Sequence, residues 1–162
     1  METRTKTVSA VGALALGATA AGTAFVVGMR RKTPIVLDAV RCSSRAAKPI
    51  VLRRAGRAGS PFAVVEHVGR RTGRSYQTPV VAAETEDGFA IALPYGQATE
   101  WLKNVVAANR TTLRAAGATH HLVAPALVGI EAVDHRFPAK EQRLHRRYGV
   151  REALVLRRSQ PH

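Results

Sequence analysis

Residues 62–93 read FAVVEHVGRRTGRSYQTPVVAAETEDGFAIAL, and the fold class follows from this segment. Runs rich in Val, Ala and aromatic residues alternate with short segments that contain Gly, Pro, Asp and Ser, which is typical of strands joined by tight turns. The Asp-Gly pair at 87–88 is a strong hairpin signal. We therefore predict an antiparallel meander of three consecutive strands. The strands are residues 62–68, 76–84 and 89–93.

Downstream of this segment the pattern continues with further strands and two helices. Apolar residues recur at helical spacing within residues 99–109, and Thr99 stands at the N-cap position. A second short helix is predicted over 137–147. The chain is therefore predicted to be an α+β protein, a small antiparallel barrel with helices on its outside. The remaining predicted strands are 111–115, 120–124, 127–133 and 153–156.

Upstream, residues 34–57 combine apolar and basic side chains at helical spacing. They predict an amphipathic helix with a strongly basic face, with a break at Pro49 as one option. This face can rest on anionic lipid headgroups or be a solvated surface over the core, and both readings stay open. A Gly-rich loop follows. We thus divide the chain after the N-terminus into a basic helix with linker (33–59) and a barrel domain (60–158).

The N-terminus contains 22 consecutive residues without charge, from 8 to 29. A membrane-spanning helix needs roughly 20 apolar residues. Residues 1–32 are therefore predicted to be an N-terminal hydrophobic helix that anchors the chain in the cell membrane. A cleaved signal peptide and a helix packed on the domain are the alternatives. More positive charges follow the segment than precede it, which favours a location of the C-terminal domain on the cytoplasmic side.

The charge balance indicates the kind of partner. The 162 residues include 25 Lys+Arg and 11 Asp+Glu, a net charge of +14, of which residues 33–162 keep +10. Such a balance predicts an acidic partner: nucleic acid, an anionic membrane or a polyanionic small molecule. The single Cys42 excludes an internal disulfide and a Cys-cluster metal site. His120 and His121 alternate faces of a strand, so no metal site is predicted.

The turn at residues 69–75 (GRRTGRS) places arginines and a hydroxyl between two glycines. Glycine allows the backbone to turn with its N–H groups outward, and arginine offers paired donors that suit a phosphate. A Walker loop is excluded, because the Gly-Lys-Ser/Thr ending is absent and a strand follows instead of a helix. From spacing alone, the turn is either an anion cradle or a basic hairpin exposed to water.

Residues 69–79 resemble the signature Gly-Arg-x-Ser/Thr-Gly-x-x-x-x-Thr-Pro of the deazaflavin (F420)-dependent nitroreductase family. The surrounding sequence is similar as well. Residues 60–63 (SPFA) lead into the signature as in one subgroup of the family. Residues 92–96 (ALPYG) resemble the family's loop after a strand, and residues 101–104 (WLKN) resemble its Trp-x-x-Asn helix. The resemblance covers residues 34–157.

The resemblance implies a split β-barrel related to FMN-binding proteins and coenzyme F420 as the cofactor, with FMN as the alternative. In the family, the Gly-Arg turn holds the phosphate of F420, and the Thr-Pro strand, the following loop and the Trp helix line the cofactor groove. Many relatives carry a Gly-Gly-x-Pro-type loop where this chain has residues 95–98 (YGQA), so the contacts to the cofactor tail are rearranged or another flavin-like ligand is bound. The implied cofactor-binding residues are Arg70, Arg71, Thr72, Gly73, Arg74, Thr78, Pro79, Tyr95, Gly96 and Trp101.

These features predict a membrane-associated oxidoreductase that transfers a hydride from reduced F420 to a quinone, nitro compound or similar electron-poor substrate. F420 carries a phosphate and an oligoglutamate tail, which suit a basic domain. The cofactor supplies the hydride chemistry. Tyr148 is the candidate proton donor or substrate-pocket residue, with solvent, Tyr76 and Tyr95 as alternatives.

Two other functions are left open. One is a non-catalytic carrier of F420, flavin or haem with the same fold. The other, from a different class, is a basic nucleic-acid-binding module. Against it, only 5% of the residues are aromatic, few for stacking on bases. Split barrels often form dimers, so a homodimer is a further expectation.

Overall fold

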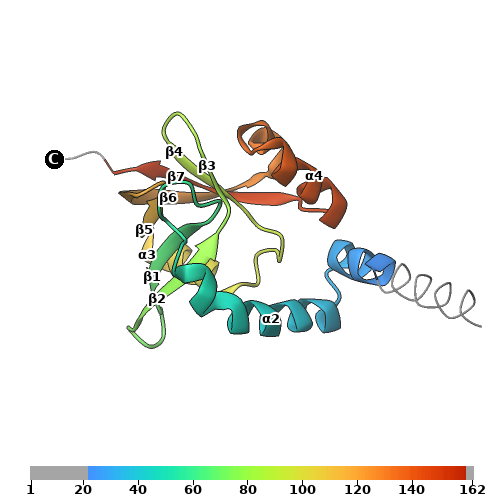
Figure 1. Cartoon of the computed structure of the whole chain (residues 1–162). Helices are drawn as coiled ribbons and strands as arrows, with labels where there is room; N and C mark the ends of the chain where they lie inside the picture. Colours follow the sequence, from blue (N-terminus) through green and yellow to red (C-terminus); the bar gives the residue numbers. More distant parts are fainter. Residues whose placement is uncertain (1–21, 160–162) are drawn as a thin grey trace, which may run out of the picture.

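Seven strands form one antiparallel sheet, in the order β2-β1-β5-β6-β7-β4-β3 (Figure 1). The computed structural model describes residues 22–159, without the side chains of residues 40–47. The α+β class predicted from the sequence is confirmed. The strands are β1 (Ala63–Val68), β2 (Ser75–Val80), β3 (Ala82–Glu84), β4 (Gly88–Ala92), β5 (Arg110–Ala115), β6 (Ala118–Gly129) and β7 (Glu152–Arg158).

The sheet curls because β2 and β3 stand at its two edges although only Val81 separates them in sequence. β2 pairs with β1, whereas β3 pairs with β4. The prediction of a single strand over 76–84 is therefore wrong. This segment forms two strands, β2 and β3, which lie at opposite edges of the sheet and pair with β1 and β4, respectively. Pro79, which has no N–H to donate, lies in the edge strand β2, where such a loss is tolerated.

β6 is one long strand where the sequence predicted two. Its register with β7 shifts between Val123 and Ala126, and Ala124 in this irregularity has a φ of 54°. Pro125 stands at the same point and cannot donate to the ladder, which explains why the pattern looked interrupted. The residues predicted as the end of the second strand, from 130 onward, form short 3-10 turns: η1 (Ile130–Ala132) and η2 (Asp134–Arg136).

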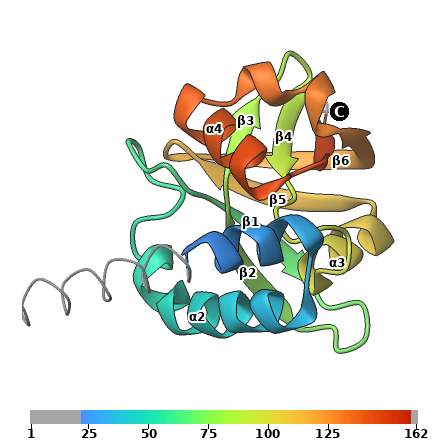
Figure 2. The same cartoon turned by 90° about the vertical axis from the view of Figure 1, so that its right-hand side faces the viewer.

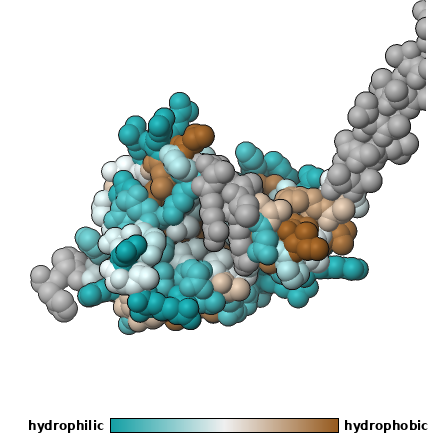
Figure 3. Space-filling view, turned by 90° about the horizontal axis from the view of Figure 1, so that it is seen from below, coloured by the Kyte–Doolittle hydropathy of each residue, from teal (hydrophilic) through white to brown (hydrophobic). Residues whose placement is uncertain are grey.

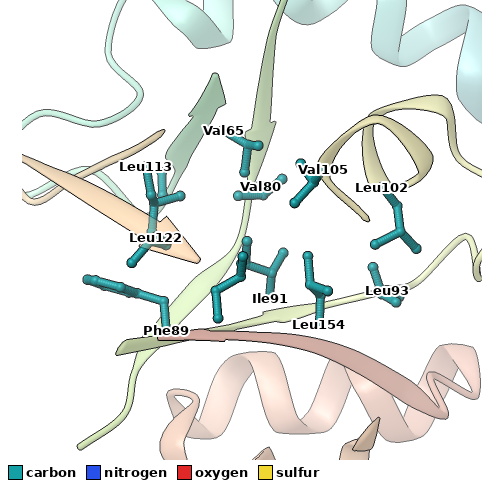
Figure 4. Close-up of a cluster of buried hydrophobic side chains, with 12 residues drawn as sticks. Val65, Val80, Phe89, Ile91, Leu93, Leu102, Val105, Leu113, Leu122 and Leu154 are labelled. Carbon is teal, nitrogen blue, oxygen red and sulfur yellow. The ribbon is translucent and has the colours of Figure 1, made fainter. Parts of the chain in front are cut away.

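Inside the curled sheet lies a core of branched aliphatic side chains. Alternation along β4 sends Phe89 and Ile91 into this core, while Ala90 and Ala92 face the other side, against Phe137 and Val150. The curled sheet therefore has a packed interior and a second apolar layer outside. Core residues with no exposed surface come from five strands and from α3, and they include Val65, Ile91, Leu113, Leu122 and Leu154 of the strands and Val105 of α3 (Figure 4).

Three helices flank the sheet: α2 (Pro34–Leu52), α3 (Glu100–Ala108) and α4 (Ala139–Tyr148). α3 closes the core with Leu102 and Val105, and Thr99 stands at its N-cap without a capping hydrogen bond from its side chain. α2 continues through Pro49, three residues before its end, so the break that the sequence left as an option does not occur. α4 begins at residue 139, two residues later than predicted, because η2 precedes it.

The N-terminal segment is described only from residue 22. Residues 22–31 are helical and lie between α2 and α4 (Figures 1 and 2). Most of the predicted hydrophobic helix, residues 1–21, falls outside the described residues. Within residues 22–159, no helix combines the length and the apolar character that crossing a membrane requires.

Candidate functional site

The turn between β1 and β2 is closed by its own backbone. The N–H groups of Thr72 and Gly73 donate to the carbonyl oxygen of Gly69 over 3.2 and 2.8 Å, and the N–H of Gly69 donates to the carbonyl of Arg74 over 2.8 Å. Gly73 has a φ of 65°, a conformation that favours glycine. The glycine spacing in the sequence therefore produces a compact turn that presents Arg70, Arg71 and Arg74 in succession.

Arg70 is held by two residues of α3. Its Nη1 donates to Asn104 Oδ1 over 2.9 Å and to Glu100 Oε2 over 2.8 Å, and its backbone N–H donates to the same Asn104 oxygen over 3.1 Å. Glu100 and Asn104 stand four residues apart, which places them on one face of the helix. Hydrogen bonds from Arg70 and then from Lys103 lower the pKa of the Glu100 carboxyl, so this group is an anion.

His67 lies behind this contact and is buried. Because Asn104 Oδ1 accepts from Arg70, its Nδ2 faces His67 and donates to the imidazole Nδ1 over 3.1 Å. The other ring nitrogen, Nε2, then carries the proton and donates to Thr78 Oγ1 over 3.1 Å. Burial, with a smaller effect of the Lys48 charge, lowers the pKa of His67 to about 4. The imidazole is thus neutral, with both nitrogens occupied.

An aromatic ring completes one wall. Tyr76 stacks on His67 with 5.7 Å between ring centroids and an interplanar angle of 20°. The Tyr76 hydroxyl lies 3.3 Å from Thr72 Oγ1. A groove of about 290 Å³ opens between this wall, the turn and the start of α3. Its lining residues are His67, Gly69, Arg70, Arg71, Thr72, Tyr76, Glu100 and Asn104.

The chemistry of this groove suits an anion. Two guanidinium groups and the hydroxyl-bearing residues Thr72 and Tyr76 line it. Arg70 is already oriented by a buried amide, so little side-chain freedom remains to be lost on binding. Its flat aromatic wall suits a planar ring. Within residues 22–159, no group of three potential metal ligands occurs.

Of the residues that the resemblance implied, Arg70, Arg71 and Thr72 line the groove, whereas Gly73 and Arg74 belong to the same turn without lining it. Thr78 supports His67 from behind. Trp101 is half-buried and packs against the core. Pro79 pairs with Val64 in the sheet. The structure therefore brings Arg70, Arg71 and Thr72 together at the groove, whereas the other implied residues do not line it.

Tyr95 and Gly96 lie in the loop after β4, and this loop contacts the N-terminal segment. Lys32 Nζ donates to the carbonyl oxygen of Pro94, and burial, followed by the Arg151 charge, lowers the pKa of Lys32. Tyr148, at the end of α4, packs edge-on against Phe25 with 6.1 Å between ring centroids. The segment 22–33 thus touches both the loop and Tyr148.

Five groove residues were absent from the implied cofactor-binding set: His67, Gly69, Tyr76, Glu100 and Asn104. Asn104 was part of the quoted Trp-x-x-Asn element, and the four-residue spacing to Glu100 indicated a shared helix face. His67 lies on the same face of β1 as the core residue Val65, and Tyr76 is its direct partner on β2. The predicted hairpin of the first two strands already implied that these residues are neighbours. No residue pattern indicated that they belong to a binding site.

Comparison with known proteins gives one extended match. Residues 43–158 match the model of a family described as F420H(2)-dependent quinone reductase, a span that includes every strand of the sheet. No curated protein matches.

The solved structures that match this chain are distant in sequence, and their TM-scores stay below 0.5. One described as an F420 reductase is 12% identical, with a TM-score of 0.43 over 61% of this chain and 86% of that one. One described as a domain-swapped dimer is 12% identical, with a TM-score of 0.45 over 59% and 79% of the two chains. A protein of unknown function from Agrobacterium tumefaciens is 14% identical, with a TM-score of 0.46 over 70% and 55%.

Proposed function

Because this chain belongs to the F420H(2)-dependent quinone reductase family, we propose that it reduces a quinone or another electron-poor acceptor, such as a nitro compound, with hydride from reduced F420 bound at the groove between β1, β2 and α3. The family membership confirms the resemblance of residues 69–79. Coenzyme F420 is the cofactor of the family, and membership in it implies an F420-dependent oxidoreductase.

The observation that carries the proposed site is the fixation of Arg70. A surface arginine loses considerable side-chain entropy when it binds a phosphate, and Arg70 has largely lost it in advance through Asn104. In the proposed complex Arg70 and Arg71 bind the phosphate of F420, Thr72 adds a hydroxyl, and the His67–Tyr76 stack borders the ring. F420, when bound, supplies the hydride; the residues bind and orient it.

A proton must accompany the hydride, and we propose Tyr148 as its donor or as a wall of the substrate pocket. Tyr148 is the last residue of α4, and its ring packs against Phe25. Gly149 and then β7 follow it in the chain. Tyr148 does not line the phosphate groove. Tyr95, in the loop contacted by Lys32, and solvent are the alternative donors.

Titration with oxidised and reduced F420, followed by fluorescence, tests the binding site. Arg70→Ala is expected to weaken binding at least about tenfold, because hydrogen bonds to charged groups contribute roughly 1.5–3 kcal/mol. Arg74→Ala is the matched control: it removes the same charge from the same turn but not from the groove. Equal effects of the two substitutions would contradict a specific site at Arg70.

Reoxidation of the bound cofactor by a menaquinone analogue separates the enzyme from a carrier. Turnover supports the reductase, whereas tight binding without reoxidation identifies a carrier. Salt-sensitive binding to arbitrary DNA with no affinity for F420 would indicate the nucleic-acid-binding module instead.

We further propose that the protein is held at the cell membrane, with its catalytic domain on the cytoplasmic side. Phe25, Val27 and Ile35 are exposed apolar residues next to the basic run at 30–32. Figure 3 shows an apolar patch on its right-hand side, where residues 22–31 and the start of α2 lie in Figure 1. Apolar side chains beside positive charges suit an anionic lipid surface.

Deletion of residues 1–21 tests the membrane proposal and leaves the Phe25 and Lys32 contacts in place. We expect the full chain to sediment with vesicles that contain anionic lipid. The shortened chain is expected to keep the part of this association that Phe25, Val27 and Ile35 supply and to lose the part that the predicted anchor supplies. Unchanged association would assign the membrane contact to residues 22–52. Limited proteolysis of the same two proteins tests the proposed domain boundaries at residues 32 and 59. Light scattering of these proteins tests the proposed homodimer.

A further inference from the structure

Glu100 is a carboxylate inside a groove that otherwise suits anions. It lines the groove with Arg70 and Arg71, and its Oε2 accepts from Arg70 Nη1 over 2.8 Å. The second carboxylate oxygen accepts from Lys103 Nζ over 3.3 Å. A negative side chain at this position repels the phosphate that the arginines would bind, so its presence in the groove requires an explanation.

The two partners of Arg70 differ in how firmly they are held. Asn104 is 6% exposed and bonded on both sides, to Arg70 and to His67. The Glu100 side chain is 67% exposed and is held by ion pairs with Arg70 and Lys103, of the kind that contribute little at a protein surface. Asn104 is therefore a fixed support, whereas Glu100 can yield its contact to another anion.

Among the charged groups that line the groove there are two cations and one carboxylate. If Glu100 stays nearby after it yields Arg70, the groove balances about one negative charge on a ligand. Repulsion from the carboxylate grows with the ligand's charge. A phosphodiester carries one negative charge, whereas a phosphomonoester carries about −1.5 to −2 at pH 7.

We propose that Glu100 is a specificity-determining residue: it takes the place of the ligand's anion on Arg70 in the free protein, and it makes the groove favour a phosphodiester over a phosphomonoester. This inference rests on the proposed function in that the groove binds the phosphate of a flavin-like cofactor. F420 contains a phosphodiester between its ribityl chain and its tail, whereas FMN ends in a phosphomonoester. Glu100 would thus allow the groove to discriminate between two cofactors that have similar tricyclic rings and ribityl chains.

The test uses two ligands that differ only in phosphate charge: FMN and the monomethyl ester of its phosphate. Binding is followed by flavin fluorescence at low salt. Glu100→Gln keeps an oxygen that accepts from Arg70 and removes the charge. It is expected to strengthen FMN binding about fivefold and ester binding no more than about twofold, as expected for loss of repulsion near a protein surface.

Glu86→Gln is the matched control. Glu86 is also an exposed carboxylate paired with an arginine, Arg136, at 2.9 Å, but it lies in the turn between β3 and β4. This variant is expected to leave the ratio of the two affinities unchanged. An equal effect of both substitutions would indicate a general effect of net charge and overturn the proposal.

Three other results overturn it as well: equal strengthening of FMN and ester binding by Glu100→Gln, weaker binding of both, or no binding of either ligand to any variant. Titration of the unaltered protein with F420 tests the proposed function separately. If F420 binds but the FMN-to-ester ratio does not respond to Glu100→Gln, only the role of Glu100 is lost. If the ratio responds and F420 does not bind, only the F420 function is lost.

Discussion

Asn104 Nδ2 lies 3.1 Å from His67 Nδ1, and this contact determines which nitrogen of the imidazole carries the proton. An amide nitrogen can only donate, so Nδ1 must accept and Nε2 must hold the proton that is directed at Thr78. The opposite end of the same amide receives two donors from Arg70. One side chain on α3 thus links the β1–β2 turn to the buried side of the sheet.

Replacing Asn104 by alanine is expected to lower the unfolding free energy by about 1–3 kcal/mol, because buried polar groups on Arg70 and His67 lose their partner. Urea denaturation measures this change. Gln77→Ala is the control: it removes an exposed amide that donates to Glu66 over 3.2 Å, and it is expected to change stability by less than about 0.5 kcal/mol. Equal stability of the two variants would show that the Asn104 contacts contribute nothing.

The low pKa of His67 predicts a specific pH dependence of stability. Because burial and the Lys48 charge lower its pKa from 6.5 to about 4 in the folded protein, the unfolded chain binds more protons between these values. The unfolding free energy therefore falls as pH falls through this window, by on the order of 2–3 kcal/mol, and the contribution is fully present above pH 6.5.

An NMR titration of the His67 ring checks this directly, with an expected midpoint near pH 4. His67→Gln supplies the thermodynamic control. A glutamine does not titrate, so the unfolding free energy of this variant should lack this part of the pH dependence. A midpoint at the ordinary value of an exposed histidine would contradict the buried, neutral imidazole.

Tyr148→Phe separates the packing role of this residue from a chemical one. The ring against Phe25 is kept, so the unfolding free energy should change by less than about 0.5 kcal/mol. If its hydroxyl supplies the proton, kcat for quinone reduction falls by about 10²-fold or more. Tyr76→Phe, which removes a hydroxyl from the cofactor groove instead, is expected to act mainly on F420 affinity. Unchanged kcat in Tyr148→Phe would leave solvent or Tyr95 as the donor.

Gly88→Ala is expected to destabilise the sheet strongly. A Cβ at this position would meet the Leu156 carbonyl oxygen and lie 2.9 Å from Arg157 Cα, and neither backbone atom can move without disturbing β7. The expected loss is about 3 kcal/mol or more, measured by thermal or urea unfolding. Gly22→Ala, where a Cβ would meet nothing within 4 Å, should leave stability nearly unchanged. A stable Gly88→Ala protein would contradict the close β4–β7 pairing.

Much of the fold was predictable because it depends on local pattern. Alternating apolar residues and an Asp-Gly pair indicate strands and hairpins wherever they occur, so the β1–β2 and β3–β4 pairings were within reach of the sequence. The division of the strand at Val81 was not. The division follows from the curling of the sheet, which places the two edge strands β2 and β3 next to each other in the sequence. The curling itself depends on packing between strands that are far apart in the chain.

The same limit applies to the site. By itself, the sequence determined that a Gly-bracketed, arginine-rich turn follows the first strand and that it resembles an F420 signature, since turn geometry and charge are local properties. Only the tertiary structure distinguished Arg70 from Arg74. Arg70 meets Asn104, 34 residues further along the chain, whereas Arg74 does not line the groove. Which of two similar arginines is oriented depends on a contact through space, and that contact exists only once α3 packs against β1.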